Sequence, residues 1–295
     1  MKYLTLFLFL FFGTTCAQAA IQLAAPQNVG RGNAFVAEAQ SDKPTDSFRF
    51  IWRGAAHMAR ATESAPGVWK AQMLLPVPLN EKASHLDLRV ETKNEKSAKT
   101  SITVKDVQRP VQKLTVDRKF VEPPASVRDR IARDREKVRK ALQTTLPERQ
   151  WTLPMQRPVP GSVSSQFGLK RIFNGQPRGE HRGLDLRGAQ GTPIHACADG
   201  VVVLVDDLYY SGNTAYVNHG EGVFSAYLHM SEANVKPGDI VRRGDIIGKV
   251  GATGRVTGPH LHLSMFAQGQ PVDPLPLLEK TSTPPNPESR QDAKK

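Results

Sequence analysis

Cysteine is scarce in this sequence, which has only Cys16 and Cys197 among 295 residues. Residues 1–19 have the pattern of an export signal, because a lysine precedes an apolar run and Ala17-Gln-Ala19 supplies the small residues of a cleavage site. Cleavage there would leave one cysteine, so no disulfide could form within the mature chain. Cys197 follows Pro193-Ile-His-Ala in a segment typical of a buried strand, and we expect a small buried apolar residue rather than a nucleophile.

Long apolar runs are also missing. The run from Leu4 to Phe12 is too short to span a bilayer, and no later stretch is longer and as apolar. An uncleaved anchor is the alternative to a cleaved signal. Either way we expect an exported protein of the periplasm or cell envelope.

Two further motifs are absent. Without HExxH, no glutamate base of the kind used by helical zinc proteases is expected. No array of basic and aromatic residues accompanies the net charge of +12, which argues against a nucleic-acid partner. The charge instead suits an acidic envelope surface.

What is present indicates a mainly β protein. Residues 20–109 contain short alternating segments such as Phe48-Arg-Phe-Ile-Trp52 and Leu86-Asp-Leu-Arg-Val90, separated by turn residues, which predicts an immunoglobulin-like β-sandwich. This region has no cluster of residues that suggests chemistry, and His57 and His85 are not expected to bind a metal. It is predicted to be a positioning or interaction domain, or alternatively a stabilising appendage.

A connector is predicted at residues 110–157. Its helix, about 126–142, has a narrow apolar stripe of Val127, Ile131, Val138 and Leu142. Seven Lys and Arg residues accompany three acids on the same helix. The helix could rest on one of the domains, or offer a basic surface to anionic polymers. The tail at residues 279–295 has the composition of a disordered segment.

Residues 158–278 alternate short strands with glycine turns. Val201-Val-Val-Leu-Val205 is a continuous apolar run, as in a strand buried on both faces, and no helix is indicated. A closed or strongly curved antiparallel β domain with a groove is the architecture that this pattern favours. Segments 170–180, 206–213 and 252–258 are expected to be loops beside the groove.

Five side chains able to bind or orient a metal fall in three short motifs of this region. The motifs are His181-Arg-Gly-Leu-Asp185, Tyr227-Leu-His229 and Pro259-His260-Leu-His262. Zinc binds imidazole nitrogen and carboxylate oxygen, and a catalytic site keeps a position open for water. Side chains alternate along a strand, so His260 and His262 should point to the same side.

Together these motifs resemble the lysostaphin/LytM-type zinc metalloendopeptidases of bacterial cell walls. The resemblance extends over about residues 158–278 and includes Val163-Ser-Ser-Gln-Phe-Gly168, Asn218-His-Gly220 and Val235-Lys-Pro-Gly-Asp239. It implies one zinc ion held by His181, Asp185 and His262. It further implies catalytic roles for His229 and His260 beside a zinc-bound water and the scissile carbonyl, with their individual roles undivided. His195 and His219 are interpreted as structural.

The resemblance also implies a substrate. Members of the family hydrolyse peptide stems and crosslinks of peptidoglycan, and we favour D-alanyl crosslinks over glycine bridges because no feature typical of glycine-bridge specificity is evident. Two alternatives stay open. One is a non-catalytic wall-binding protein or amidase activator, and the other is a latent enzyme inhibited by its N-terminal region. The domain at residues 20–109 is also a candidate for contact with another envelope component.

Overall fold

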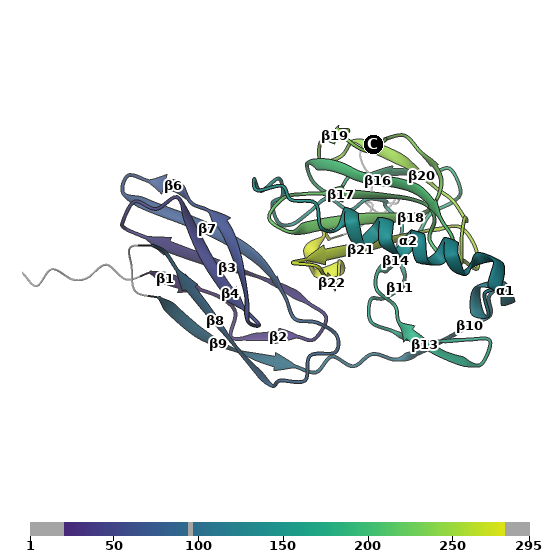
Figure 1. Ribbon diagram of the computed structural model, residues 1–295, viewed down its shortest axis with the longest axis horizontal. Coiled ribbons are helices and arrows are strands. Elements are labelled where there is room, and N and C mark those ends of the chain that lie inside the picture. Colours follow the sequence, from purple (N-terminus) through teal and green to yellow (C-terminus); the bar gives the residue numbers. More distant parts are fainter. Residues whose placement is uncertain (1–20, 94–96, 281–295) are drawn as a thin grey trace, which may run out of the picture.

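A computed structural model describes residues 21–93 and 97–280. The expected export signal and residues 281–295 of the expected tail lie outside the described residues. The protein is mainly β, with an N-terminal β-sandwich and a C-terminal β unit joined by a helical connector (Figure 1). Within the described ranges, no helix combines the length and apolarity needed to cross a membrane.

The N-terminal sandwich consists of two sheets packed face to face. One sheet has the order β1 (Gln22–Ala24), β3 (Ala34–Ser41), β7 (Val68–Pro76), β6 (Thr62–Ala65). The other has the order β2 (Asn28–Gly30), β9 (Ala98–Lys105), β8 (His85–Glu91), β4 (Ser47–Trp52), β5 (Ala55–Arg60). Alternate residues of β4, namely Phe48, Phe50 and Trp52, are buried between the sheets, as the period of two requires. The predicted sandwich is therefore confirmed.

The connector is more structured than its sequence suggests. It contains strand β10 (Val111–Leu114), a short helix α1 (Arg118–Val121), a 3-10 turn η1 (Ala125–Val127) and helix α2 (Arg128–Ala141). Strand β10 and helix α1 were not anticipated, because four-residue elements leave little periodicity to recognise. Strand β10 pairs in parallel with a strand of the C-terminal unit, β12 (Lys170–Phe173).

Helix α2 packs on the C-terminal unit. Val138 and Leu142 lie against a small cluster of Tyr216, Ala226 and Leu228. At the polar edge Lys137 pairs with Asp206 at 2.6 Å and Arg130 with Asp207 at 2.9 Å. Of the two alternatives for this helix, the first describes its position, because the helix rests on the C-terminal unit. The exposed ion pairs contribute little stability compared with the apolar contacts.

One 10-stranded sheet, in which the strands pair antiparallel, forms the C-terminal β unit. Its order is β11 (Val163–Ser165), β14 (Leu184–Arg187), β21 (His260–Ala267), β18 (Val223–Ala233), β17 (Gly212–Asn218), β16 (Gly200–Leu208), β19 (Ile240–Val241). Three further strands attach to it, β15 (Pro193–His195), β20 (Ile246–Val250) and β22 (Gln270–Val272), followed by a 3-10 turn η2 (Leu275–Leu277).

Cys197 lies in the core of this unit and is fully buried, as expected. Its backbone N–H donates to the hydroxyl of Tyr227 at 2.8 Å. Burial raises the pKa of the Cys197 thiol to about 12. The thiol therefore stays protonated at neutral pH, where it packs as a small apolar group.

Two of the three expected loops are partly strand. Segment 170–180 is a hairpin of β12 and β13 (Gln176–Glu180), and segment 206–213 lies mostly in the ends of β16 and β17. The hairpin turns at Asn174 and Gly175, whose φ angles are 49° and 80°. Asn-Gly with both φ values positive is the preferred two-residue hairpin turn, so the sequence did contain the signal. Segment 252–258 has no helix or strand, as predicted.

The two β units are in direct contact. Leu74 of β7 is buried in the core cluster of the C-terminal unit, and the backbone N–H of Asp273 donates to Gly32 O at 2.7 Å. The guanidinium of Arg109 joins the units by donating to Phe167 O at 2.8 Å and to Arg31 O at 2.6 Å.

Glu221 is an acid at this interface. Its Oε2 is buried with no hydrogen-bond partner among the described residues. Burial raises the pKa of Glu221 to about 7, although the charge of Arg149 and a backbone N–H of Arg60 oppose the shift. The folded protein therefore holds this proton where the unfolded chain has lost it, and stability should fall as pH rises from about 4.5 to 7.

Replacing Glu221 should remove this pH dependence. We expect Glu221→Gln to melt at nearly the wild-type temperature at pH 4 and about 1–3 °C higher at pH 8, allowing for partial solvent screening. Thermal unfolding of both proteins at several pH values measures the difference. Asp87→Asn, at an exposed position of β8, is the control. A gap between wild type and Glu221→Gln that does not grow with pH would contradict the assignment.

Candidate metal centre

The register between β14 and β21 builds the site. Asp185 is paired directly with His262, and both side chains project from the same face of the sheet. The leucines that flank them in sequence, Leu184, Leu186, Leu261 and Leu263, are fully buried in the core on the opposite face. Gly183 precedes β14, and a Cβ there would lie 2.3 Å from His262 Nε2. A glycine is therefore needed for His262 to occupy this position.

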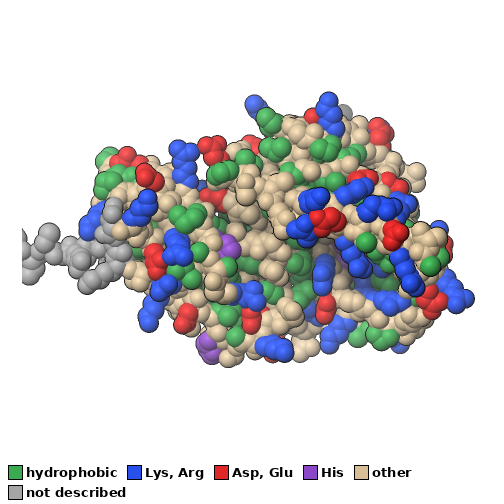
Figure 2. Space-filling model, in the orientation of Figure 1, with side chains coloured by type: hydrophobic (Ala, Val, Ile, Leu, Met, Phe, Trp, Pro, Cys, Tyr) green, Lys and Arg blue, Asp and Glu red, His purple; other side chains and the backbone are tan. Residues whose placement is uncertain are grey.

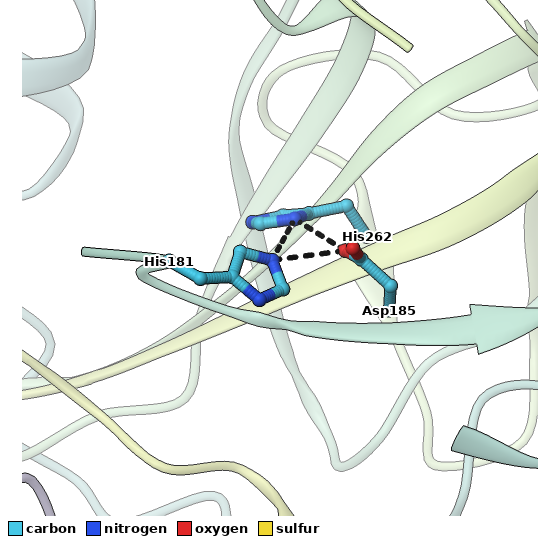
Figure 3. Close-up of side chains that lie close together, drawn as sticks. All are labelled: His181, Asp185 and His262. Carbon is cyan, nitrogen blue, oxygen red and sulfur yellow. Dashed lines mark hydrogen bonds and ion pairs between the residues drawn. The ribbon is translucent and has the colours of Figure 1, made fainter. Parts of the chain in front are cut away.

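Three possible metal ligands converge at this point (Figure 3). His181 Nε2 lies 3.0 Å from Asp185 Oδ1 and 3.0 Å from His262 Nδ1. His262 Nδ1 lies 2.8 Å from the same carboxylate oxygen. His181 is buried and immediately precedes the turn into β14, as expected for a residue delivered by a loop. The predicted convergence of the three side chains is present.

The surrounding hydrogen bonds fix which ring nitrogens carry protons. His181 Nδ1 lies 2.7 Å from Gln166 O, a carbonyl that can only accept, so Nδ1 donates and Nε2 keeps its lone pair. The Ser264 hydroxyl donates to Arg182 O at 2.9 Å and therefore accepts from His262 Nε2 at 3.0 Å. Nδ1 of His262 is left with its lone pair toward the other two groups. These tautomers are assigned from the hydrogen-bond network.

Asp185 completes the set as an ionised carboxylate. Burial opposes its ionisation, but the contact with the two imidazoles holds the pKa of Asp185 well below its ordinary value. Its second oxygen, Oδ2, accepts from Arg171 Nη2 at 3.0 Å. Arg171 thus occupies one carboxylate oxygen, and Oδ1 is left facing the two imidazoles.

With these tautomers, three acceptor atoms face one another at 2.8–3.0 Å with no proton between them. Such an arrangement is repulsive unless a cation lies among the three. The edge between ligands in a tetrahedral zinc site is about 3.3 Å, given bonds of about 2.0–2.1 Å. The donor set of two imidazoles and one carboxylate fits zinc, and its spacing of 2.8–3.0 Å is slightly shorter than this edge. The partners of the outer nitrogens are of the kind that orient metal-bound histidines.

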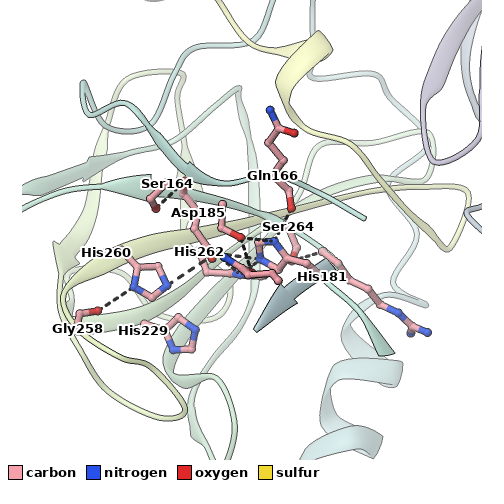
Figure 4. Close-up of polar contacts among 12 residues, drawn as sticks. Ser164, Gln166, His181, Asp185, His229, Gly258, His260, His262 and Ser264 are labelled. Atoms are coloured by element: carbon pink, nitrogen blue, oxygen red, sulfur yellow. Dashed lines mark hydrogen bonds and ion pairs between the residues drawn. The ribbon is translucent and has the colours of Figure 1, made fainter. Parts of the chain in front are cut away.

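His229 and His260 lie beside this cluster (Figure 4). Their ring centroids are 5.2 Å apart, and the ring of His229 is 5.8 Å from that of His262. Each Nδ1 donates to a backbone carbonyl at 2.8 Å, His229 to Thr253 and His260 to Gly258. Both rings are therefore held in place with Nε2 available. His260 Nε2 lies 3.8 Å from Asp185 Oδ1.

The backbone of His229 is in an unusual conformation. Its φ is 64°, the left-handed region that non-glycine residues seldom adopt. Residues held in such conformations cluster at functional sites, where the surrounding structure compensates the strain. Burial, together with the charges of His262 and His260, lowers the pKa of His229 to about 3. The imidazole is therefore neutral at pH 7.

Four of the five residues, Asp185, His229, His260 and His262, border a polar pocket of about 270 Å³. Besides the histidines and Asp185, its walls include Gln112 and Leu114 of β10, and Arg171, Arg187 and Arg255. Gln112 accepts a hydrogen bond from Ser165 Oγ at 3.0 Å. The place of the connector in this pocket was not predicted, since β10 is four residues long and lies some sixty residues before the strand it joins.

The remaining histidines lie elsewhere. His195 Nδ1 donates to Gly244 O at 2.8 Å. His219 donates to Asp199 O at 2.6 Å and contacts Ser225 Oγ at 2.7 Å, and burial lowers the pKa of His219 to about 4. Both support turns of the C-terminal unit, in agreement with a structural interpretation. His57 and His85 belong to the N-terminal sandwich.

Loss of a converging donor should remove the metal. We expect His181→Ala, Asp185→Ala and His262→Ala to be purified with far less than one equivalent of zinc, because two remaining donors do not make a stable site. Elemental analysis of purified variants measures this. His260→Ala, which removes a neighbouring imidazole outside the cluster, should retain its zinc. Zinc loss in His260→Ala would contradict this division.

The hydroxyl of Ser264 should affect the affinity for zinc only through its hydrogen bond with His262. We expect Ser264→Ala to weaken zinc affinity by about 10- to 100-fold, the usual cost of losing a hydrogen bond that orients a metal-binding histidine. Competition with a chelator measures the affinity. Ser225→Ala is a matched control, because Ser225 makes the same hydroxyl contact with His219, away from the cluster. Equal affinity in the two variants would show that Ser264 does not act on the metal.

Comparison with known proteins concerns the C-terminal unit, which carries the candidate metal centre. Residues 179–274 match the model of Peptidase family M23. Peptidoglycan DD-endopeptidase ShyA of Vibrio cholerae is 41% identical over 114 residues, which cover 38% of this chain and 26% of that protein. The chain thus spans about a quarter of the length of the curated relatives it matches.

Two solved structures extend the comparison. The crystal structure of a Pseudomonas aeruginosa protein assigned to family M23 is 28% identical, covers 84% of this chain and 94% of that one, and has a TM-score of 0.62. The catalytic domain of lysostaphin from Staphylococcus simulans is 34% identical, with a TM-score of 0.37, and the match covers 41% of this chain and 93% of that domain. The resemblance drawn from the motifs is confirmed, and residues 179–274 of this chain belong to peptidase family M23.

Proposed function

We propose that this protein is a zinc metalloendopeptidase that hydrolyses peptide crosslinks of peptidoglycan in the periplasm or cell envelope. The observation that carries the proposal is the set of three unprotonated acceptor atoms within 3.0 Å of one another, bordering a pocket with two further histidines. The name of the Vibrio cholerae relative supports the substrate class. The pattern of an export signal supports the location.

In this proposal His181, Asp185 and His262 hold one zinc ion. Zinc, when bound, supplies a Lewis acid that lowers the pKa of water to about 7 and polarises a peptide carbonyl. Gln166 and Ser264 keep the two ligating rings in the correct tautomer. Arg171 keeps the carboxylate oriented through Oδ2.

His229 and His260 have different environments, and this suggests different roles. The low pKa of His229 makes it a poor proton carrier at pH 7, so we assign it to orienting the nucleophile by a hydrogen bond at Nε2. His260 is more accessible, and its Nε2 lies 3.8 Å from Asp185 Oδ1, next to the proposed metal ligands. We assign His260 to proton transfer and to stabilising the oxyanion of the reacting carbonyl.

For the bond that is cut, we favour D-alanyl crosslinks over glycine bridges. The Vibrio cholerae relative is named a DD-endopeptidase and is 41% identical over the matched residues. The identity to the catalytic domain of lysostaphin is lower, at 34%.

A latent form of the enzyme is the second candidate, because the connector reaches the site. Gln112, Leu114 and Val116 line the same pocket as the histidines, and β10 is hydrogen-bonded to its wall. Movement of this segment would widen the groove. A substrate too broad for the present pocket would then require displacement of β10 before cleavage.

Digestion of purified peptidoglycan followed by mass spectrometry of the muropeptides tests the proposed function. We expect the zinc-loaded protein to convert crosslinked dimers to monomers. His260→Ala should lower turnover by about 10²- to 10⁴-fold, the usual contribution of a general acid or base. His85→Ala, at an exposed position of the sandwich, should retain full activity. Intact dimers after prolonged digestion by zinc-loaded wild type would support a non-catalytic wall-binding or activating role instead.

A further inference from the structure

The pocket beside the five site residues is strongly basic. Among the described residues that line it, three are arginines, Arg171, Arg187 and Arg255, and the only acid is Asp185. Figure 2 shows Lys and Arg side chains over both halves of this face, several of them on the half that carries α2 and β13. A bound zinc would add further positive charge. The pocket therefore has an excess of positive charge that its own residues do not neutralise.

Two of these arginines differ in how they are engaged. Arg171 donates to Asp185 Oδ2 at 3.0 Å and to Ser165 Oγ at 3.3 Å, so its charge already serves the ligand set. Arg255 makes no side-chain hydrogen bond or ion pair with any described residue, although its backbone N–H donates to Tyr210 O at 2.9 Å. Arginine carries five N–H donors, and leaving them unpaired in a pocket is costly unless a ligand or water completes them.

Arg255 is nevertheless held in place. Its guanidinium carbon lies 4.9 Å from the ring centroid of Phe173 and 4.7 Å from that of Tyr210. Both distances are within the range of cation–π interaction. The group is therefore positioned by its flat faces, whereas the N–H donors at its edge have no acceptor among the described residues.

No acid offsets its charge. Burial lowers the pKa of Arg255, and of the nearby groups only the Tyr210 side chain opposes this, while Arg171 and Arg178 lower the pKa further. Arginine stays protonated under these conditions. An unpaired, fixed guanidinium among other arginines is a receptor for a planar anion, since a carboxylate accepts two parallel hydrogen bonds from its fork.

We propose that Arg255 binds a free carboxylate of the substrate peptide close to the scissile bond, and thereby selects anionic stem peptides over neutral ones. The inference rests on the proposed function, because it concerns the substrate of the same pocket. Stem peptides that contain acidic and diamino residues carry such carboxylates, whereas a glycine bridge carries none along its length. Arg255 is thus a specificity-determining residue, and its position favours D-alanyl crosslinks for a reason independent of the relatives.

The test measures binding first, so that it does not depend on turnover. The zinc-loaded full-length protein is titrated with an uncrosslinked stem peptide in its free-carboxylate form and with the same peptide amidated at its side-chain and α-carboxylates. We expect the wild type to bind the carboxylate form about 10- to 100-fold more tightly, the range for a charge-assisted hydrogen bond. Arg255→Gln should bind both forms with the affinity of the wild type for the amide.

Two further variants complete the experiment. Arg255→Lys keeps the charge without the planar fork and should recover only part of the discrimination. Arg133→Gln, at an exposed position of α2 outside the pocket, should discriminate as the wild type does. Equal binding of the two peptides by the wild type, or undiminished discrimination in Arg255→Gln, would overturn the inference.

A parallel digestion of carboxylate and amidated crosslinked dimers separates this inference from the proposed function. Selective binding together with selective cleavage supports both. Discrimination in binding with neither dimer cleaved would sustain the anion subsite and refute the peptidase. Cleavage of both dimers at equal rates, with the peptides also bound equally, would sustain the peptidase and refute the subsite.

Discussion

The pairing register between β14 and β21 is the constraint on which the site depends. A shift of one residue would turn Asp185 and His262 into the core and bring leucines to the surface, because alternate side chains point to opposite faces. The flanking leucines are fully buried, so the hydrophobic core that stabilises the sheet also fixes the donors on one side of it. Stability and metal binding are therefore set by the same register.

The orientation of the site histidines is set by backbone carbonyls rather than by contacts among the histidines. His181 is oriented by Gln166 O, and His229 by Thr253 O. The hydroxyl of Ser264 accepts from His262 Nε2 and donates to Arg182 O, so it ties the His262 ring to the backbone. Backbone carbonyls of a paired sheet and its turns move little, so they hold the imidazole rings in the orientation that a metal ion requires. Such preorganisation lowers the cost of assembling the site when a cation binds.

Much of this could be predicted from the sequence, and what could not be has physical causes. Strand alternation predicted that His260 and His262 lie on one side, and the resemblance to a known family implied that His181 and Asp185 meet His262. Propensity alone could not reveal β10, because a four-residue edge strand is defined by its partner and not by its own pattern. Arg255 was not found either, since its role depends on Phe173, far away in the chain.

The connector changes how the boundary of the C-terminal unit should be regarded. A fragment beginning at residue 158 would lack β10, which hydrogen-bonds to β12 and contributes Gln112 to the pocket. It would also lack α2, whose Val138 covers the apolar cluster around Tyr216. A change in the activity of such a fragment would have two causes that cannot be told apart, the loss of a wall of the pocket and the relief of inhibition by the connector. Single substitutions that weaken the contact of Gln112 with Ser165, within the full chain, separate these effects because the apolar packing stays intact.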